Sequence, residues 1–234
     1  MGAFYLITCE HGGNRIPPKY RALFRNARAL LDTHRGYDAG ALAMARELAA
    51  ALQAPLISST VSRLLVDLNR SVGHPRSHHE AIRDIAPELR DEILERYYRP
   101  YRAQAEQCVG DAVAGHRRVI HISSHSFTPV LDGKTRSADV GLLYDPARHG
   151  EVALCERWKN ALTVLAPHLK VRRNYPYAGK GDGLTRHLRR RYSPRVYVGV
   201  ELEINQKHVV APAAQYRALR RAIVDALRIA LDEK

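Results

Sequence analysis

The chain has 234 residues, of which 45% are hydrophobic, so it is long enough to bury a sizeable core and fits one domain over residues 1–234 better than two small ones. No stretch approaches the roughly 18 consecutive apolar residues of a membrane span, which excludes a membrane-spanning helix. Cys9, Cys108 and Cys155 show no paired spacing, and no secretory leader is evident, so we expect a soluble protein in the reducing cytoplasm.

The formal net charge of +13 is compatible with three kinds of partner: nucleic acid, an anionic lipid surface, or an anionic small molecule. Arginine clusters occur at 172–173, 186–195 and 220–221, but no helix-turn-helix, zinc-finger or RNP-like signature accompanies them. Only 7% of residues are aromatic, so the stacking platforms of single-strand binders are not evident. A solvated arginine-rich surface is the simpler interpretation, and nucleic-acid binding is kept as an alternative function.

The first predicted elements are a strand at 4–7 and a short helix from 20 to 31, where apolar residues recur at helical spacing. A polar turn containing Asp38 leads into an alanine-rich helix at 39–52. Because Asp38 falls at an N-cap or first-turn position, helix capping is one explanation for its presence.

Strands are predicted next at 55–59 and 62–70, which completes a strand-helix-strand unit and favours a largely parallel sheet. The polar loop at 73–79 has histidines that could bind a metal, although no strand fixes them: His74, His78 and His79.

A helix is predicted over 86–109, with Pro100 expected to kink or divide it, and an apolar strand follows at 119–127. The remaining elements are a strand at 140–144, a helix around Trp158, a strand at 170–175, a glycine-rich loop at 176–185 that could cover a site, an exposed helix at 186–191, an alternating strand at 195–204 and a last helix from Pro212.

Polar residues follow four of these strands at their carboxyl ends, in the segments 9–14, 67–70, 125–126 and 201–203. In open α/β sheets, ligands bind in the crevice outside the carboxyl ends of the strands. The four segments can therefore form one site, although they are far apart in sequence.

The residue types in these segments indicate a mononuclear hydrolytic metal site, which needs three nitrogen or carboxylate ligands and a nearby carboxylate as base. His11, Asp38 and His125 could supply the ligands, and Glu203 or Glu201 could supply the base. A single histidine of this kind is more often structural than a ligand, so the hypothesis depends on the whole set.

Two other kinds of chemistry are less well supported. A phosphate-binding loop at 11–13 would need a GxxxxGK[ST] or GxGxxG pattern, which is missing. Serines beside histidines at 123–126 are compatible with nucleophilic catalysis, but the GxSxG pattern is also missing. Arg63, Asn69 and Arg70 could hold a substrate carboxylate, although Arg63 could equally pair with the local acid Asp67.

The ordered motifs resemble the N-formylglutamate amidohydrolase family over residues from about 5 to 210. They are Glu10-His11-Gly12-Gly13-Asn14, the segment 34–41, Arg63-Leu64-Leu65-Val66-Asp67-Leu68-Asn69-Arg70, Ser124-His125-Ser126-Phe127, Asn174-Tyr175-Pro176-Tyr177 and Glu201-Leu202-Glu203-Ile204-Asn205. The family is similar to zinc carboxypeptidases, which implies a phosphorylase/hydrolase-like, three-layer αβα fold with a twisted, mostly parallel mixed sheet.

The resemblance makes His11 and His125 zinc ligands, Glu203 the general base, and the Asn69-Arg70 pair a contact for the substrate carboxylate. Carboxypeptidases carry glutamate three residues after the first histidine, where this chain has Asn14. We therefore assign the remaining ligand to Asp38, with Glu10 in reserve.

The implied activity is zinc-dependent hydrolysis of the N-acyl amide of a small anionic amino acid such as N-formyl-L-glutamate. Another divalent ion could replace zinc, and another N-acyl amino acid or peptide could be the substrate. An amidase of cell-wall peptides would share the metal site but would need an export signal.

Overall fold

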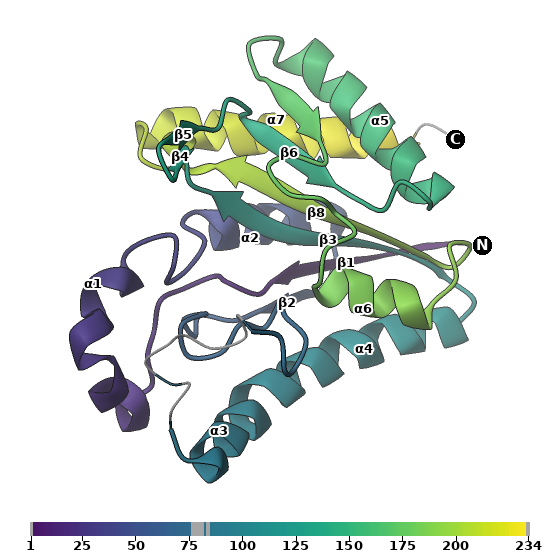
Figure 1. The fold of residues 1–234 in the computed structure, drawn as a ribbon. Coiled ribbons are helices and arrows are strands. Elements are labelled where there is room, and N and C mark those ends of the chain that lie inside the picture. The colour runs from purple at the N-terminus through teal and green to yellow at the C-terminus, as the bar shows by residue number, and fades with distance from the viewer. Residues whose placement is uncertain (1, 76–81, 83–84, 233–234) are drawn as a thin grey trace.

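A six-stranded mixed sheet lies at the centre of the molecule, in the order β2-β1-β3-β8-β6-β7 (Figure 1). The computed structural model describes residues 2–75, 82 and 85–232. The strands of the main sheet are β1 (Ala3–Cys9), β2 (Leu56–Ser58), β3 (Arg118–Phe127), β6 (Val140–Leu143), β7 (Val171–Arg173) and β8 (Tyr197–Asn205). A separate ribbon pairs β4 (Val130–Leu131) with β5 (Lys134–Thr135).

Strands β2, β1, β3 and β8 run parallel, whereas β6 runs antiparallel to β8 and carries β7 parallel to itself. The carboxyl ends of β1, β3 and β8 therefore meet at one edge of the sheet. This arrangement positions the candidate site.

Helices cover both faces of the sheet (Figure 1). One face packs against α2 (Ala41–Leu52), α5 (His149–Leu165) and α7 (Ala213–Asp232), and its core includes the only tryptophan, Trp158, which is completely buried. The elements on the other face are η1 (Pro18–Ala27), α1 (Arg28–Leu31), α3 (Pro87–Ile93), η3 (Leu94–Tyr98), α4 (Arg99–Ala114) and α6 (Leu184–Arg191). The predicted three-layer αβα fold with a mostly parallel mixed sheet is confirmed.

The helix predicted over 86–109 extends to Ala114 and contains a π-helical stretch, η3, just before Pro100. Proline cannot donate to the carbonyl four residues earlier, and a π-helical stretch changes which carbonyls are paired. Pro100 lies in the first turn of α4, so the chain stays helical through it instead of being divided.

The prediction of a strand at 62–70 is wrong, because this segment is a series of turns. The Ser62 hydroxyl donates to the Gly36 carbonyl at 2.8 Å and accepts from the Leu64 amide at 3.3 Å, which holds the backbone in a turn. Leu64 and Leu65 are buried in the core beside the sheet. A short apolar run fits a buried strand or any other buried segment, so periodicity alone could not decide.

Smaller corrections concern the helices. The segment predicted as a helix at 20–31 is mostly the 3₁₀ helix η1, followed by the single turn of α1. In α6, which was predicted to be exposed, Arg189 is buried and donates to Glu151 Oε1 at 2.9 Å. A 3₁₀ turn, η4 (Gln206–His208), follows β8.

The remaining features concern the cysteines, the histidine loop and the membrane. All three cysteines are free thiols. Of the histidines proposed as ligands in the loop at 73–79, His78 and His79 lie outside the described residues. No helix within 2–75 and 85–232 is long and apolar enough to cross a membrane.

Candidate active site

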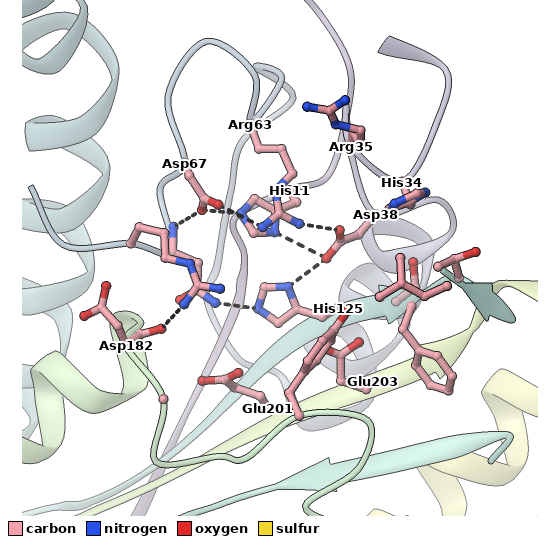
Figure 2. Close-up of a pocket in the computed structure, with 18 of the residues that line it drawn as sticks. His11, His34, Arg35, Asp38, Arg63, Asp67, His125, Asp182, Glu201 and Glu203 are labelled. Carbon is pink, nitrogen blue, oxygen red and sulfur yellow. Dashed lines mark hydrogen bonds and ion pairs between the residues drawn. The ribbon is translucent and has the colours of Figure 1, made fainter. Parts of the chain in front are cut away.

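A cavity of about 660 Å³ opens at the carboxyl ends of β1, β3 and β8 (Figure 2). His11 follows β1, His125 lies near the end of β3, and Glu203 lies near the end of β8. The turn before α2, the segment after β2 and the loop at 176–185 also line the cavity. The cavity brings together all the residues that the sequence predicted for the site: His11, Asp38, Arg63, Asn69, Arg70, His125 and Glu203.

His11 lies between two acids and is almost fully buried. Its Nδ1 atom is 3.3 Å from Asp38 Oδ2, and its Nε2 atom is 2.7 Å from Asp67 Oδ1. Asp67 Oδ1 also accepts from the Asn69 amide at 2.9 Å, which fixes the carboxylate in a local turn. Asp67 therefore orients the His11 ring.

His125 repeats this arrangement. Its Nδ1 atom is 2.9 Å from Asp38 Oδ2, and its Nε2 atom is 3.1 Å from Glu10 Oε2. Ser123 donates to the same Glu10 oxygen at 2.7 Å. A histidine that binds a metal through one ring nitrogen commonly donates its other N–H to a carboxylate, and Asp67 and Glu10 are placed to accept from Nε2. Both histidines are thus arranged with Nδ1 toward Asp38.

Asp38 does not cap α2. The N-cap residue is Gly40, at φ 80°, and no side chain caps this helix end. The Asp38 carboxylate instead faces His11, His125 and Arg63, the last at 3.2 Å. The capping explanation for Asp38 is therefore wrong, and its side chain belongs to the cavity.

The donor atoms of His11, Asp38 and His125 lie within 4.8 Å of one another. Two imidazole nitrogens and one carboxylate oxygen form the donor set of many hydrolytic zinc sites, so these residues fit a zinc ion. The alternative ligands point elsewhere. Glu10 faces the Nε2 side of His125, and Asn14 Nδ2 donates to Asp32 Oδ1 at 2.8 Å.

Electrostatics keep Asp38 and His125 ionised. Burial alone would raise the pKa of Asp38, but His11, His125 and Arg63 outweigh it and hold that pKa well below its usual range. Burial likewise opposes ionisation of His125, whereas Asp38 and Glu10 raise its pKa well above the ordinary value. The Arg63 guanidinium contacts Asp38 and also Asp67, the latter at 2.8 Å, so it neutralises two acids at once.

Glu203 is the other buried acid of the cavity. Burial raises its pKa to about 8, with Asp38 and Glu201 adding to this effect and His125 opposing it. Its Oε2 atom has no hydrogen-bond partner among the described residues. Glu201, two residues earlier on β8, instead accepts from the Thr185 hydroxyl at 2.5 Å. Glu203 therefore has a free oxygen for a ligand or a water molecule, whereas Glu201 has a protein partner.

Replacing Glu203 with glutamine should change how the stability of the metal-free protein depends on pH. A raised folded-state pKa favours folding below the ordinary value of 4.5, and this contribution is lost as the pH rises through about 8. Glutamine removes the ionisation, so the free energy of unfolding of the variant relative to wild type should increase over this window, by up to a few kcal/mol. Urea unfolding with a chelator across the same pH range measures it. A difference in free energy of unfolding that does not vary with pH would contradict the raised pKa of Glu203.

Asn69 and Arg70 join the cavity to the glycine-rich loop at 176–185. Asn69 Oδ1 accepts from the Leu184 amide at 2.7 Å, and its Nδ2 atom lies 3.4 Å from His125 Nε2. Arg70 Nη1 donates to the Asp182 carbonyl at 2.7 Å. The loop lines the cavity through Tyr177, Ala178, Gly181 and Asp182, beside the site it was predicted to cover.

Several residues of the site were not predicted in their observed roles. Glu10 was considered only as a reserve ligand, and Asp67 only as a partner of Arg63, yet each contacts a histidine ring. Their positions carried a signal, since Glu10 immediately precedes His11 and Asp67 lies in the motif of Asn69. Nothing in the sequence pointed to the contact between Thr185 and Glu201.

A family model described as N-formylglutamate amidohydrolase matches residues 4–210, which include the whole cavity set. The chain belongs to the N-formylglutamate amidohydrolase family. Its members are hydrolases of amide bonds, which agrees with the acid and histidine cluster described above. A search of curated protein sequences found no significant match to this chain.

Solved structures resemble this amidohydrolase family member over almost its full length. The gene product Atu2144 from Agrobacterium tumefaciens is 29% identical, with a TM-score of 0.80 over 97% of this chain and 90% of the other. An N-formylglutamate amidohydrolase from Ralstonia eutropha JMP134 is 18% identical, with a TM-score of 0.71 over 99% of this chain and 94% of the other. The latter similarity shows a shared fold.

Proposed function

We propose that the chain is a zinc-dependent amidohydrolase that removes the N-acyl group of an acidic amino acid, with N-formyl-L-glutamate as the preferred substrate. The observation that supports this most directly is the buried set of His11, Asp38 and His125 beside Glu203, whose Oε2 atom lacks a partner among the described residues. A cavity of about 660 Å³ suits a small N-acyl amino acid.

The residues of the cavity have distinct roles in this proposal. His11, Asp38 and His125 hold the metal, and Asp67 and Glu10 orient the two imidazole rings through Nε2. A zinc ion bound there would polarise the acyl carbonyl and lower the pKa of its water. Glu203 Oε2 accepts a proton from the attacking water and delivers it to the leaving amine nitrogen.

Substrate binding is assigned to the other wall of the cavity. Asn69 lies beside His125, and Arg70 lines the same cavity; both offer donors to the α-carboxylate of the substrate. Arg63, predicted as a further substrate contact, is engaged by Asp38 and Asp67, so its main effect is to keep those acids ionised. Other N-acyl amino acids or peptides are the alternative substrates.

Metal content and turnover test this proposal together. Elemental analysis of the purified protein should find about one zinc ion per chain, as a site with three protein ligands requires. Chelation should abolish release of formate from N-formyl-L-glutamate, and added zinc should restore it. Another divalent ion that restores turnover better would change the metal but not the reaction. Turnover that is unaffected by metal removal, or binding of an oligonucleotide without any hydrolysis, would contradict the proposal.

A further inference from the structure

His34 and Arg35 form part of the cavity wall and have no role in the chemistry described above. They lie in the turn that leads to Asp38. Figure 2 shows them on the Asp38 side of the two histidines, away from Asp182. The bond-breaking centre therefore lies between these two residues and the Asp182 side of the cavity, where Arg70 contacts the glycine-rich loop.

The cavity is lined by Arg35, Arg63 and Arg70, and these differ in how much of each guanidinium group is already engaged. Arg63 contacts two acids, and Arg70 donates to the Asp182 carbonyl. The Arg35 side chain makes no hydrogen bond or ion pair with any residue in the described part of the chain; only its backbone amide donates, to Thr33 Oγ1. All the donors of its guanidinium are thus available to a ligand.

The surroundings of Arg35 are positively charged. After burial, the strongest influences that lower the pKa of His34 are Arg136, Arg35 and Arg63, so three guanidinium groups act on one imidazole. Arg136 Nη1 donates to the Tyr177 hydroxyl at 3.0 Å, and Tyr177 lines the cavity. The nearby acid, Asp38, is already held by His11, His125 and Arg63. This wall therefore favours an anion supplied by the ligand.

We propose that Arg35 determines substrate specificity by binding the side-chain carboxylate of an acidic N-acyl amino acid. The inference rests on the proposed function and adds to it the residue that distinguishes an acidic side chain from a neutral one. The α-carboxylate binds near Asn69 and Arg70, the amide lies at the histidines, and the side-chain carboxylate extends to Arg35. An arginine and a carboxylate form paired, charge-assisted hydrogen bonds, which suits this discrimination.

The test compares N-formyl-L-glutamate with N-formyl-L-glutamine, which has the same shape but no side-chain charge. Arg35→Met should lower kcat/KM for the glutamate compound by roughly tenfold to a hundredfold, mainly through KM, because a charge-assisted contact is lost. The value for the glutamine compound should change by less than about twofold, since that substrate makes no ionic contact. Arg35→Lys should recover part of the loss, because it restores the charge without the planar fork.

The matched control is Arg25→Ala, which removes another exposed arginine, in η1, that does not line the cavity. This variant should have the same kcat/KM as wild type for both substrates. Equal losses for the two substrates in Arg35→Met would show that Arg35 supports the fold or the metal site, and no loss for either substrate would show that the carboxylate binds elsewhere. Either outcome overturns the proposal.

A binding measurement separates this proposal from the proposed function. Glutarate is a dicarboxylate without an amide, so its binding does not depend on hydrolysis. Calorimetric titration should show weaker glutarate binding to Arg35→Met than to wild type, and no such difference for butyrate. Equal glutarate affinities would overturn the role of Arg35, even if N-formyl-L-glutamate is cleaved. A difference in affinity without cleavage of any N-formyl amino acid would support the anion site and reject the proposed reaction.

Discussion

Glu203→Gln is expected to lower kcat for N-formyl-L-glutamate by about 10²- to 10⁴-fold while zinc stays bound, because a general base typically contributes that factor. The amide keeps the volume of the side chain but cannot accept the proton. The Oε2 atom has no partner in the described part of the protein, so the substitution breaks no hydrogen bond at this oxygen. Steady-state kinetics on the zinc-loaded variant, together with its zinc content, measure the effect.

Glu201→Gln is the matched control, since Glu201 lies two residues earlier on the same strand and lines the same cavity. Its carboxylate accepts from Thr185, so we expect a loss well below that of Glu203→Gln. A larger loss in Glu201→Gln, or turnover near the wild-type rate in zinc-loaded Glu203→Gln, would reassign the base.

His125→Ala is expected to abolish both zinc retention and activity, because two remaining protein ligands hold zinc too weakly. It should also destabilise the metal-free fold by about 3–5 kcal/mol, since Asp38 and Glu10 each lose a partner for a buried charge. Elemental analysis measures the first effect, and urea unfolding of the chelated protein measures the second.

His125→Gln separates ligation from packing, because its amide can still donate to one of the two acids while lacking the imidazole. It should lose zinc like the alanine variant but unfold at a higher urea concentration. Full zinc occupancy in either variant would remove His125 from the metal site.

The parts of the site that the sequence predicted are those whose position follows from strand order. His125 and Glu203 lie near the ends of parallel strands, and His11 follows a third, so sheet geometry brings them together. The segment containing Asp67 reaches the same edge without being a strand. Its buried leucines gave the apolar signal, whereas the turn depends on a hydrogen bond from Ser62 to Gly36, 26 residues away.

The sequence predicted Asp38 as a ligand and left helix capping as the local alternative, and the folded chain shows its carboxylate facing the histidines. Contacts that orient the histidine rings, in contrast, were not predictable. Glu10 and His125 are 115 residues apart in the chain, and the pairing of β1 with β3 brings them into contact. Such pairs are set by the tertiary fold, for which a single sequence carries no local pattern.

The register of β3 against β8 places His125 directly opposite Glu203, so adjacent backbone hydrogen bonds set the spacing between the proposed ligand and base. A shift of one residue in either strand would turn its side chain to the opposite face, so this spacing cannot be adjusted gradually. Arg35 and Arg70, in contrast, lie on turns, where strand register does not fix the side chain. A substitution at Arg35 can therefore change substrate preference while the spacing of the proposed ligand and base is kept. Exchange of the side chain at position 35 alone should therefore alter the preference between acidic and neutral substrates without loss of zinc.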